Sequence, residues 1–509
     1  MAPLDITQKK ASENQVTVAQ KQTPYFDALE KYIETGVIPF HVPGHRQGMG
    51  VHEKFKNFVK KHGLAADVSQ VLGLDDIHQP TSVVEQAQEL AAQAYGVEHS
   101  FFMINGSSSG VHAMLLATLN PGDKIILPRN CHRSVTGALI LTGAIPVYIE
   151  PEYDYEMQVD HTVTPKALKK TIQQNKDAKA VLLLSPTYYG AACDIKKMVE
   201  IIHKYDLPAL VDEAWGAHFH FHPDLPDSAC DAGADIIINS THKLVGSMAQ
   251  ASMVHTQGNR IDLGRLRSVI RLFLSTSPSC LLVASLDVAR MNLAINGREL
   301  LDRTIKLANY AREQINKIPG LKAYGKELIG RSGVHQLDLT KLTVSAKELD
   351  ITGYEIENIL RYNYNIQFEM SDLFNCLALI TIGTTEKDIE KIIEAFGDVK
   401  SWQRQHHNLS KVRLFYRRKE KQMELPDWPN QILTPREAFV RPFEKIRLRE
   451  STGRICGEVI TPYPPGIPIL RPGDEITEQI IDHLILEMEA GVHIQGPDDP
   501  TMETIRVVK

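Results

Sequence analysis

Between Thr81 and Asn239 short apolar runs alternate with longer amphipathic stretches, and this alternation limits the folds open to the chain. The apolar runs are rich in valine, isoleucine and leucine, which is typical of strands buried on both faces of a sheet. We therefore expect an α/β fold with a mostly parallel sheet covered by helices. The expected helices are 83–95, 109–119, 132–142, 165–174 and 194–205, and the expected strands are 100–104, 124–127, 145–149, 178–184, 209–212 and 235–239.

The rest of the chain divides into further segments, because 509 residues exceed the size of a single hydrophobic core. A long amphipathic stretch over 281–318 predicts a helix that leaves the large domain. Beyond it, 378–382 and 386–396 predict a strand and a helix of a smaller α/β domain. The predicted order is a flexible arm at 1–22, an N-terminal segment at 23–80 with a helix at 24–34, a large domain at 81–290, a small domain at 291–400, a linker at 401–429 and a C-terminal α+β domain at 430–509.

The composition argues against several classes of protein. Six cysteines are scattered without a C-x-x-C pair, which is typical of a reduced cytoplasmic protein and not of a disulfide framework or a zinc ribbon. The net charge is only −6, and basic residues alternate with acidic ones, so nucleic acid is not an expected partner. The N-terminal residues lack an apolar leader, and the apolar runs are shorter than a bilayer span, so we expect no membrane insertion.

One lysine follows directly after a predicted strand. The segment Ile237-Ile-Asn-Ser-Thr-His-Lys243 begins as an apolar run, and burial beside a strand end lowers the pKa of an amine. Capture of an aldehyde requires a neutral amine, so Lys243 is a candidate Schiff-base residue. Asp212 ends another predicted strand, where its carboxylate could keep a pyridine nitrogen protonated. The pair suggests pyridoxal 5′-phosphate as the cofactor, and the alternative is two surface residues at strand ends.

Two further segments follow predicted strands and would reach the same edge of a parallel sheet. The loop Asn105-Gly-Ser-Ser-Ser-Gly110 opens a predicted helix and offers backbone N–H groups and hydroxyls to a phosphate, although such a loop is also typical of an ordinary turn. His132 follows strand 124–127, where it would stack on a cofactor ring or cap a helix. The sequence contains no G-x-x-x-x-G-K-[ST] motif, so a nucleotide P-loop is not supported.

Five histidines form a rival constellation. His218, His220 and His222 alternate along the chain and would share one face of a strand, where three imidazoles could bind zinc. Together with His41 and His45 they would suggest a metal-dependent hydrolase. No clear set of carboxylate ligands accompanies them, so we expect no metal site. His218, which is close to the aspartate of the cofactor pair, would instead support the cofactor site.

Several motifs together resemble the short form of the bacterial Orn/Lys/Arg decarboxylases, which are fold type I pyridoxal-phosphate enzymes. The resemblance extends over nearly the whole chain from His41 onward. The matching motifs are HVPGH at 41–45, NGSSSG at 105–110, PRNCHRS at 128–134, VDEAWGAH at 211–218, STHKLVGS at 240–247, STSPS at 275–279 and PYPPGIPILRPGD at 462–474. The resemblance implies an aspartate aminotransferase-like large domain, followed by a smaller α/β domain and a C-terminal decarboxylase domain.

The resemblance also implies roles for individual residues. In the family the lysine of S-x-H-K binds the cofactor and the aspartate of D-x-A binds the pyridine nitrogen, and these positions are Lys243 and Asp212. Catalytic roles are further expected for His132, on one face of the cofactor ring, and for His242. The other cofactor-binding candidates are Ala214 on the opposite ring face, Ser108, Ser109, Ser240 and His242 around the phosphate, and Thr276 or Ser277 from a partner subunit.

The activity implied by the resemblance is decarboxylation of a basic amino acid. Short-form relatives favour arginine, giving agmatine for polyamine synthesis, over lysine to cadaverine or ornithine to putrescine. A basic side chain needs a distal acid, and Glu458 and Asp474 are candidates, while Trp215 and His218 could shape the substrate site. A homodimer or tetramer with active sites at the subunit interface is expected. A catalytically silent regulatory relative is the remaining alternative, and the intact lysine and aspartate argue against it.

Overall fold

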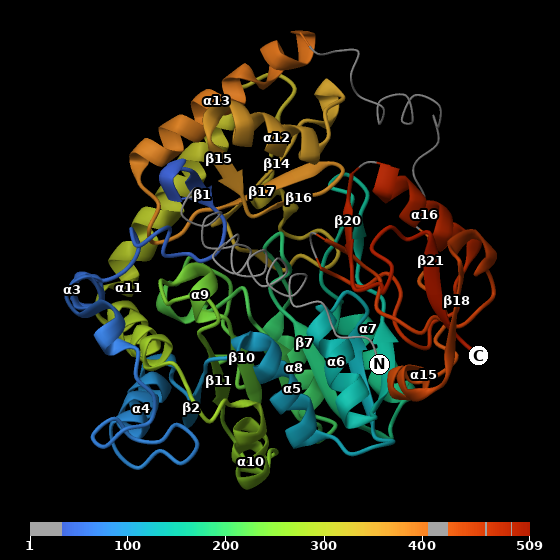
Figure 1. The fold of residues 1–509 in the computed structure, drawn as a ribbon, viewed down its shortest axis with the longest axis horizontal. Coiled ribbons are helices and arrows are strands. Elements are labelled where there is room, and N and C mark those ends of the chain that lie inside the picture. Colours follow the sequence, from blue (N-terminus) through green and yellow to red (C-terminus); the bar gives the residue numbers. More distant parts are fainter. Residues whose placement is uncertain (1–32, 406–425, 464–465, 490) are drawn as a thin grey trace, which may run out of the picture.

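The computed structural model of the chain describes residues 33–405, 426–463, 466–489 and 491–509. Figure 1 shows three bodies, with a large domain at the bottom, a small domain at the top and a C-terminal domain at the right. The predicted arm at 1–22, most of the predicted helix at 24–34 and most of the linker at 401–429 lie outside the described residues.

The large domain is built on a seven-stranded sheet with the order β2-β11-β10-β9-β7-β3-β4. The strands from β10 to β4 run parallel, whereas β11 pairs antiparallel with both β10 and β2. The expectation of a mostly parallel sheet is therefore confirmed. The sequence pattern does not predict β11, because serine and histidine interrupt its apolar run. The strands are β2 (His99–Met103), β3 (Lys124–Pro128), β4 (Ile145–Ile149), β7 (Ala178–Leu184), β9 (Ala209–Asp212), β10 (Ile236–Asn239) and β11 (Ser252–Thr256).

Five helices accompany this sheet where the apolar periodicity predicts them, to within one turn at each end. They are α4 (Val83–Tyr95), α5 (Gly106–Thr118), α6 (Arg133–Thr142), α7 (Pro165–Gln174) and α8 (Ile195–His203). A further helix, α10 (Leu263–Phe273), packs on α5. Strand residues beneath the helices, such as Ile126, Leu210 and Ile237, are completely buried. Because apolar burial is the main stabilising term, it holds the polar residues at the strand ends in fixed positions.

The small domain contains a four-stranded antiparallel sheet with the order β12-β14-β17-β16. Its elements are β12 (Lys322–Ala323), β14 (Lys341–Ser345), β16 (Met370–Ser371), β17 (Asn375–Leu379), α12 (Gly353–Tyr364) and α13 (Glu386–Gln405). The strand β1 (Ile38–Phe40) joins this body by parallel pairing with β15 (Ile366–Phe368). The loop that follows β1 then reaches the large domain, where the Gly44 N–H donates to the His242 carbonyl at 2.9 Å.

The helix α11 (Cys280–Ile315) confirms the long helix predicted from the sequence and links the two domains. Leu286 near its start lies in the core of the large domain, whereas Ala308 and Ala311 near its end lie in the core of the small domain. Among the described residues it is the one helix whose length and composition would allow it to cross a membrane, and 33 % of its most apolar window is buried. A core helix passes the same test, and the contacts of α11 with both cores account for its composition.

The C-terminal domain packs its own small core beside the large domain (Figure 1). A buried ion pair anchors it, because the Arg129 Nη2 group after β3 lies 2.6 Å from the Asp474 carboxylate. The Arg471 side chain adds a second bond by donating to the Arg129 carbonyl at 2.5 Å. The elements of this domain are α15 (Pro435–Val440), β18 (Phe443–Arg447), β19 (Thr461–Tyr463), α16 (Glu478–Glu489), β20 (His493–Gln495) and β21 (Thr504–Val508).

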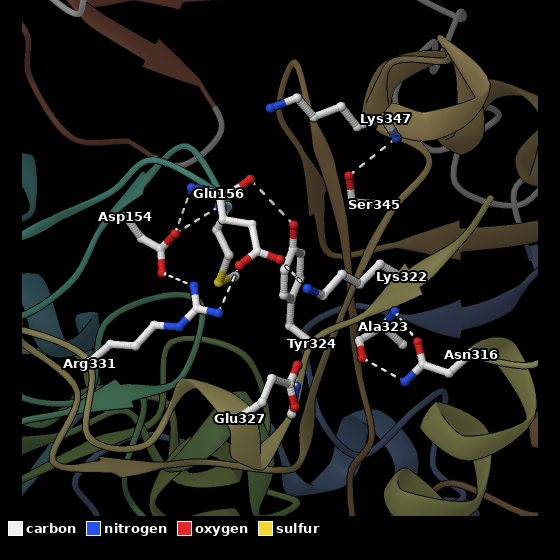
Figure 2. A network of polar contacts seen from close by, with 12 residues as sticks. Asp154, Glu156, Asn316, Lys322, Ala323, Tyr324, Glu327, Arg331, Ser345 and Lys347 are labelled. Carbon is white, nitrogen blue, oxygen red and sulfur yellow. Dashed lines mark hydrogen bonds and ion pairs between the residues drawn. The ribbon is translucent and has the colours of Figure 1, made fainter. Parts of the chain in front are cut away.

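A cluster of charged residues, which we call the interdomain clasp, ties the large domain to the small domain (Figure 2). The hairpin of β5 (Tyr153–Asp154) and β6 (Val159–Asp160) in the large domain presents Asp154 and Glu156. Arg331 of the small domain binds the two carboxylates at 2.8 and 2.7 Å. Lys322 makes an ion pair with Glu156. Burial opposes the charge of Asp154, but bonds from His161, the backbone and Arg331 hold the pKa of this carboxyl well below its usual range.

We expect Arg331→Met to lower the midpoint of thermal unfolding by a few degrees. The substitution leaves the buried Asp154 carboxylate without its guanidinium partner, and loss of a hydrogen bond to a charged group costs about 1–3 kcal/mol. The matched control is Lys326→Met, which changes an exposed lysine in the same domain. Differential scanning calorimetry compares the two variants, and equal midpoints would show that the clasp does not stabilise the domain arrangement.

Candidate active site

The structure brings Lys243 and Asp212 together at one edge of the central sheet. Asp212 ends β9, and β10, which pairs in parallel with β9, leads into the short helix α9 (Thr241–Leu244) that carries Lys243. Burial lowers the pKa of Lys243 to about 8, while the charge of Asp212 acts in the opposite direction. Burial raises the pKa of Asp212, and Lys243 opposes that shift. The two groups therefore interact electrostatically inside an environment that disfavours charge.

Aromatic rings and a tightly packed loop enclose the Lys243 amine. Its Nζ atom lies 3.9 Å from the centroid of the Trp215 ring and 6.0 Å from that of Tyr188. The Trp215 Nε1–H is buried and has no hydrogen-bond partner among the described residues. The HVPGH loop closes over the backbone, because a Cβ atom on Gly44 would lie only 2.5 Å from the Lys243 carbonyl oxygen. Only glycine permits this approach, so the loop and the lysine are fixed together.

His132 caps a helix, which confirms one of the two sequence interpretations of this residue, and it lies within electrostatic range of Lys243. Its Nδ1 atom accepts from the Ser134 N–H at 3.2 Å at the start of α6. Burial, and after it the charge of Lys243, lowers the pKa of His132 to about 3. The imidazole is therefore neutral at physiological pH, and its ring is held beside the lysine.

The N-terminus of α5 reaches the same edge of the sheet. The hydroxyls of Ser107 and Ser240 lie 2.7 Å apart, which joins the start of α5 to the segment before Lys243. Ser109 instead donates to the Gly106 carbonyl within its own helix, and Ser108 lies next to it, half-buried. Sequence reasoning named the two serines that follow Ser107 and missed Ser107 itself, because a G-S-S-S run does not reveal which hydroxyl faces the neighbouring strand. A helix N-terminus with hydroxyls beside it favours an anion.

His242 precedes Lys243, and its side chain contacts the backbone just before β11. Its Nδ1 atom lies 2.8 Å from the Ala251 carbonyl, which can only accept, so Nδ1 carries the proton and Nε2 does not. Burial lowers the pKa of His242 to about 4, so this imidazole is neutral.

The remaining residues predicted for the cofactor site lie in two places. Ala214 donates its N–H to the Asp212 carboxylate at 3.1 Å. Thr276 and Ser277 are exposed in the turn between α10 and α11.

A second carboxylate, Glu369, lies in the site and was not found from the sequence. It sits between β15 and β16, and its Oε2 atom accepts from the Val42 N–H at 2.7 Å. Burial raises the pKa of Glu369, and the nearby charges of Lys243, His41 and Lys341 oppose that effect. The one signal in the sequence was an acid flanked by two large apolar residues. That pattern alone does not indicate a site residue, because Glu369 reaches Lys243 only through the packing of the small domain against the large domain.

The predicted strand of alternating histidines is wrong. The structure places Phe219–Phe221 in a single 3₁₀ turn, which points the three histidines to three different carboxylates. The nearest pairs are His218 Nε2 with Asp338 at 3.3 Å, His220 Nδ1 with Asp231 at 2.8 Å and His222 Nε2 with Asp302 at 3.0 Å. No group of three metal-binding side chains occurs in the part of the chain that the structure describes. The rival interpretation as a metal-dependent hydrolase therefore has no structural support.

The two acids that the sequence suggested for substrate recognition are engaged elsewhere. Asp474 forms the buried ion pair with Arg129 that anchors the C-terminal domain. Glu458 accepts from the Asp498 N–H at 2.8 Å and from the Arg506 N–H at 2.7 Å inside that domain. Both carboxylates thus stabilise the C-terminal domain and its attachment, whereas Glu369, together with Asp212, interacts with Lys243.

Comparison with known proteins matches nearly the whole chain to one protein family. The major domain of the Orn/Lys/Arg decarboxylases matches residues 23–388, and the C-terminal domain of that family matches residues 418–497. The chain is 41 % identical to the arginine decarboxylase of Bacillus subtilis (strain 168), covering 97 % of this chain and 99 % of that protein. The constitutive lysine decarboxylase of Escherichia coli (strain K12) shows 23 % identity, covering 93 % of this chain and 78 % of its own length.

The fold is shared with solved decarboxylase structures. The crystal structure of a lysine decarboxylase from Francisella novicida matches with a TM-score of 0.77 at 22 % identity, covering 92 % of this chain and 78 % of that one. The predicted fold class, a fold type I large domain with a mostly parallel sheet, is confirmed.

Lys243 should react with an acylating reagent at a lower pH than an ordinary lysine. Only the neutral amine reacts, and because the pKa of Lys243 is lowered to about 8, its labelling should rise through about pH 8. A lysine-containing peptide in the same mixture should follow the ordinary value of ~10.4. Peptide mass spectrometry of the cofactor-free protein measures both curves, and coincident midpoints would contradict the enclosed site described above.

Proposed function

The chain belongs to the Orn/Lys/Arg decarboxylase family, and from this premise we propose that it converts L-arginine to agmatine and carbon dioxide with pyridoxal 5′-phosphate. The observation that carries the choice of arginine is the 41 % identity to an arginine decarboxylase over nearly the whole length of both chains. Lysine and ornithine are the alternative substrates, since lysine decarboxylases are related at lower identity.

The residues around Lys243 suit this cofactor. The N-terminus of α5, with Ser107 and Ser240 beside it, offers N–H and O–H donors to a phosphate. Asp212 would hold the pyridine nitrogen, and the unpartnered Trp215 Nε1–H would find an acceptor on the ring substituents. Bound to Lys243, the cofactor would supply an electron sink for the bond between Cα and the substrate carboxylate.

Each enclosing residue has a defined task in this proposal. Asp212 keeps a proton on the pyridine nitrogen, because a buried carboxylate strongly favours a cation next to it. His132 and Ala214 would hold the cofactor ring between them and exclude water. Lys243 Nζ would carry a proton to and from the substrate Cα, and the unprotonated His242 Nε2 is a second acceptor near the same backbone turn.

The guanidinium of the substrate needs a carboxylate partner, for which we propose Glu369. It is half-buried and interacts electrostatically with Lys243 and Lys341, and the Val42 N–H fixes one of its oxygens. Burial raises the pKa of Glu369, and a bound cation would favour its charged form. Tyr463 of the C-terminal domain lies within electrostatic range of Glu369, so all three domains would meet around the substrate side chain.

We propose that the active enzyme is a homodimer or tetramer located in the cytoplasm. Thr276 and Ser277 are exposed in their own subunit, which suits contact with the phosphate group in a partner subunit. All six cysteines are free, and five of them are buried, which is typical of proteins in a reducing compartment.

We expect carbon dioxide release to be fastest with arginine, when arginine, lysine and ornithine are compared in the presence of pyridoxal 5′-phosphate. Lys243→Ala should reduce the rate to background, because it removes the amine that holds the cofactor and moves the proton. Lys347→Ala, which changes an exposed lysine of the small domain, is the matched control. A preference for lysine or ornithine would overturn the choice of substrate, and activity retained in Lys243→Ala would overturn the role of the lysine.

Glu369→Gln should raise the KM for arginine by about 10- to 100-fold, because losing one partner of a buried charge pair costs about 1.5–3 kcal/mol. The control is Glu348→Gln, an exposed acid of the same domain. Glu458→Gln, measured in parallel, should leave KM nearly unchanged. Steady-state kinetics with arginine separates the cases, and a larger KM effect at Glu458 than at Glu369 would return the role of distal acid to the C-terminal domain.

A further inference from the structure

A second lysine, Lys341, is completely buried beside the active site and takes no part in the chemistry described above. It begins β14, which pairs on both sides within the small-domain sheet, so its backbone is firmly held. Its side chain is 0 % exposed. The stem passes over Gly190, where an added Cβ would lie 3.1 Å from Lys341 Cγ. A side chain at position 190 would therefore press on the Lys341 stem.

Burial lowers the pKa of Lys341, and two acids, Asp338 and Glu369, oppose that shift and favour its charged form. Asp338 Oδ2 lies 3.5 Å from Lys341 Nζ and 3.3 Å from His218 Nε2. The other carboxylate oxygen accepts from the Thr340 N–H and hydroxyl at 3.0 and 2.6 Å. Burial works to raise the pKa of Asp338, but His218, Lys341 and Thr340 hold it well below its usual range. Burial lowers the pKa of His218, so the carboxylate and the lysine are the charged members of this cluster.

Lys341 and Lys243 face the same indole ring. Lys341 Nζ lies 4.5 Å from the centroid of the Trp215 ring, and Lys243 Nζ lies 3.9 Å from it. Two ammonium groups around one ring repel each other, and low-dielectric surroundings strengthen the repulsion. The charge of Lys341 accordingly lowers the pKa of Lys243.

We propose that Lys341 is a positioning residue that keeps the amine of Lys243 uncharged and free to react. The proposal rests on the assigned role of Lys243 and adds a cause for its reactivity. Burial is the largest cause of the lowered pKa of Lys243, while Asp212 and Glu369 both favour the charged form of the amine. Lys341 is the cation that adds to the effect of burial against these two acids, from the side of Trp215. The closest precedent in general chemistry is a catalytic lysine activated by an adjacent cationic group.

The labelling of Lys243 in the cofactor-free protein tests this proposal. In Lys341→Met the midpoint of the labelling curve should move upward by about one pH unit, because a like charge has been removed. Lys341→Arg keeps the charge and should label near the wild-type midpoint. Lys347→Met, which removes an exposed lysine of the same domain, should also match the wild type.

Unchanged labelling in Lys341→Met would overturn the proposal, as would equal shifts in the methionine and arginine variants, which would point to a packing effect. Lys341→Gln is the second neutral variant if the methionine variant does not fold, since its amide can still donate to Asp338. The readout does not depend on substrate. A protein that failed to decarboxylate arginine would still report whether Lys341 controls the amine of Lys243.

Discussion

The opposed charges of Lys243 and Asp212, held in an apolar interior, are the interaction on which the rest of the site depends. Asp212 ends the completely buried strand β9, and Lys243 lies in the short helix that follows the completely buried strand β10, so the core fixes both positions. Burial drives both toward neutrality, and their mutual attraction drives both toward charge. The result is an amine whose pKa of about 8 lies close to physiological pH. A group that gains and loses a proton works best when its pKa lies near that pH.

The other domains act on this pair from outside the sheet. The loop after β1 is pinned to the small domain by pairing with β15 and to the large domain by the close approach of Gly44 to Lys243. Glu369 is then fixed by the backbone of that same loop through Val42. The interdomain clasp and the Arg129–Asp474 pair set the positions of the small and C-terminal domains. Polar contacts between the domains therefore help to position charged groups, such as Glu369, around Lys243 and Asp212.

The parts that the sequence predicted well are those set by local physics. Apolar periodicity placed α4, α7 and β7 at their observed bounds, and residues at strand ends such as Asp212 follow from those elements. The residues that it missed are set by tertiary contacts. Glu369 and Lys341 come from the small domain, and nothing near them in the sequence indicates which face of the large domain they meet. The strand interpretation of the histidines at 218–222 was wrong because it relied on local pattern alone. Their alternation fits a strand, but the chain makes a 3₁₀ turn there.

The charges of the site also give a physical reason to favour a guanidinium over an ammonium. Glu369 already faces two lysines, and a substrate cation entering a buried pocket loses hydration. An ammonium responds to this cost by giving up its proton, whereas a guanidinium stays charged and offers two parallel N–H donors to one carboxylate. Burial raises the pKa of Glu369, and a guanidinium that stays charged would favour the ionised form of the acid. The position of Glu369 thus fits our proposal of arginine as the substrate.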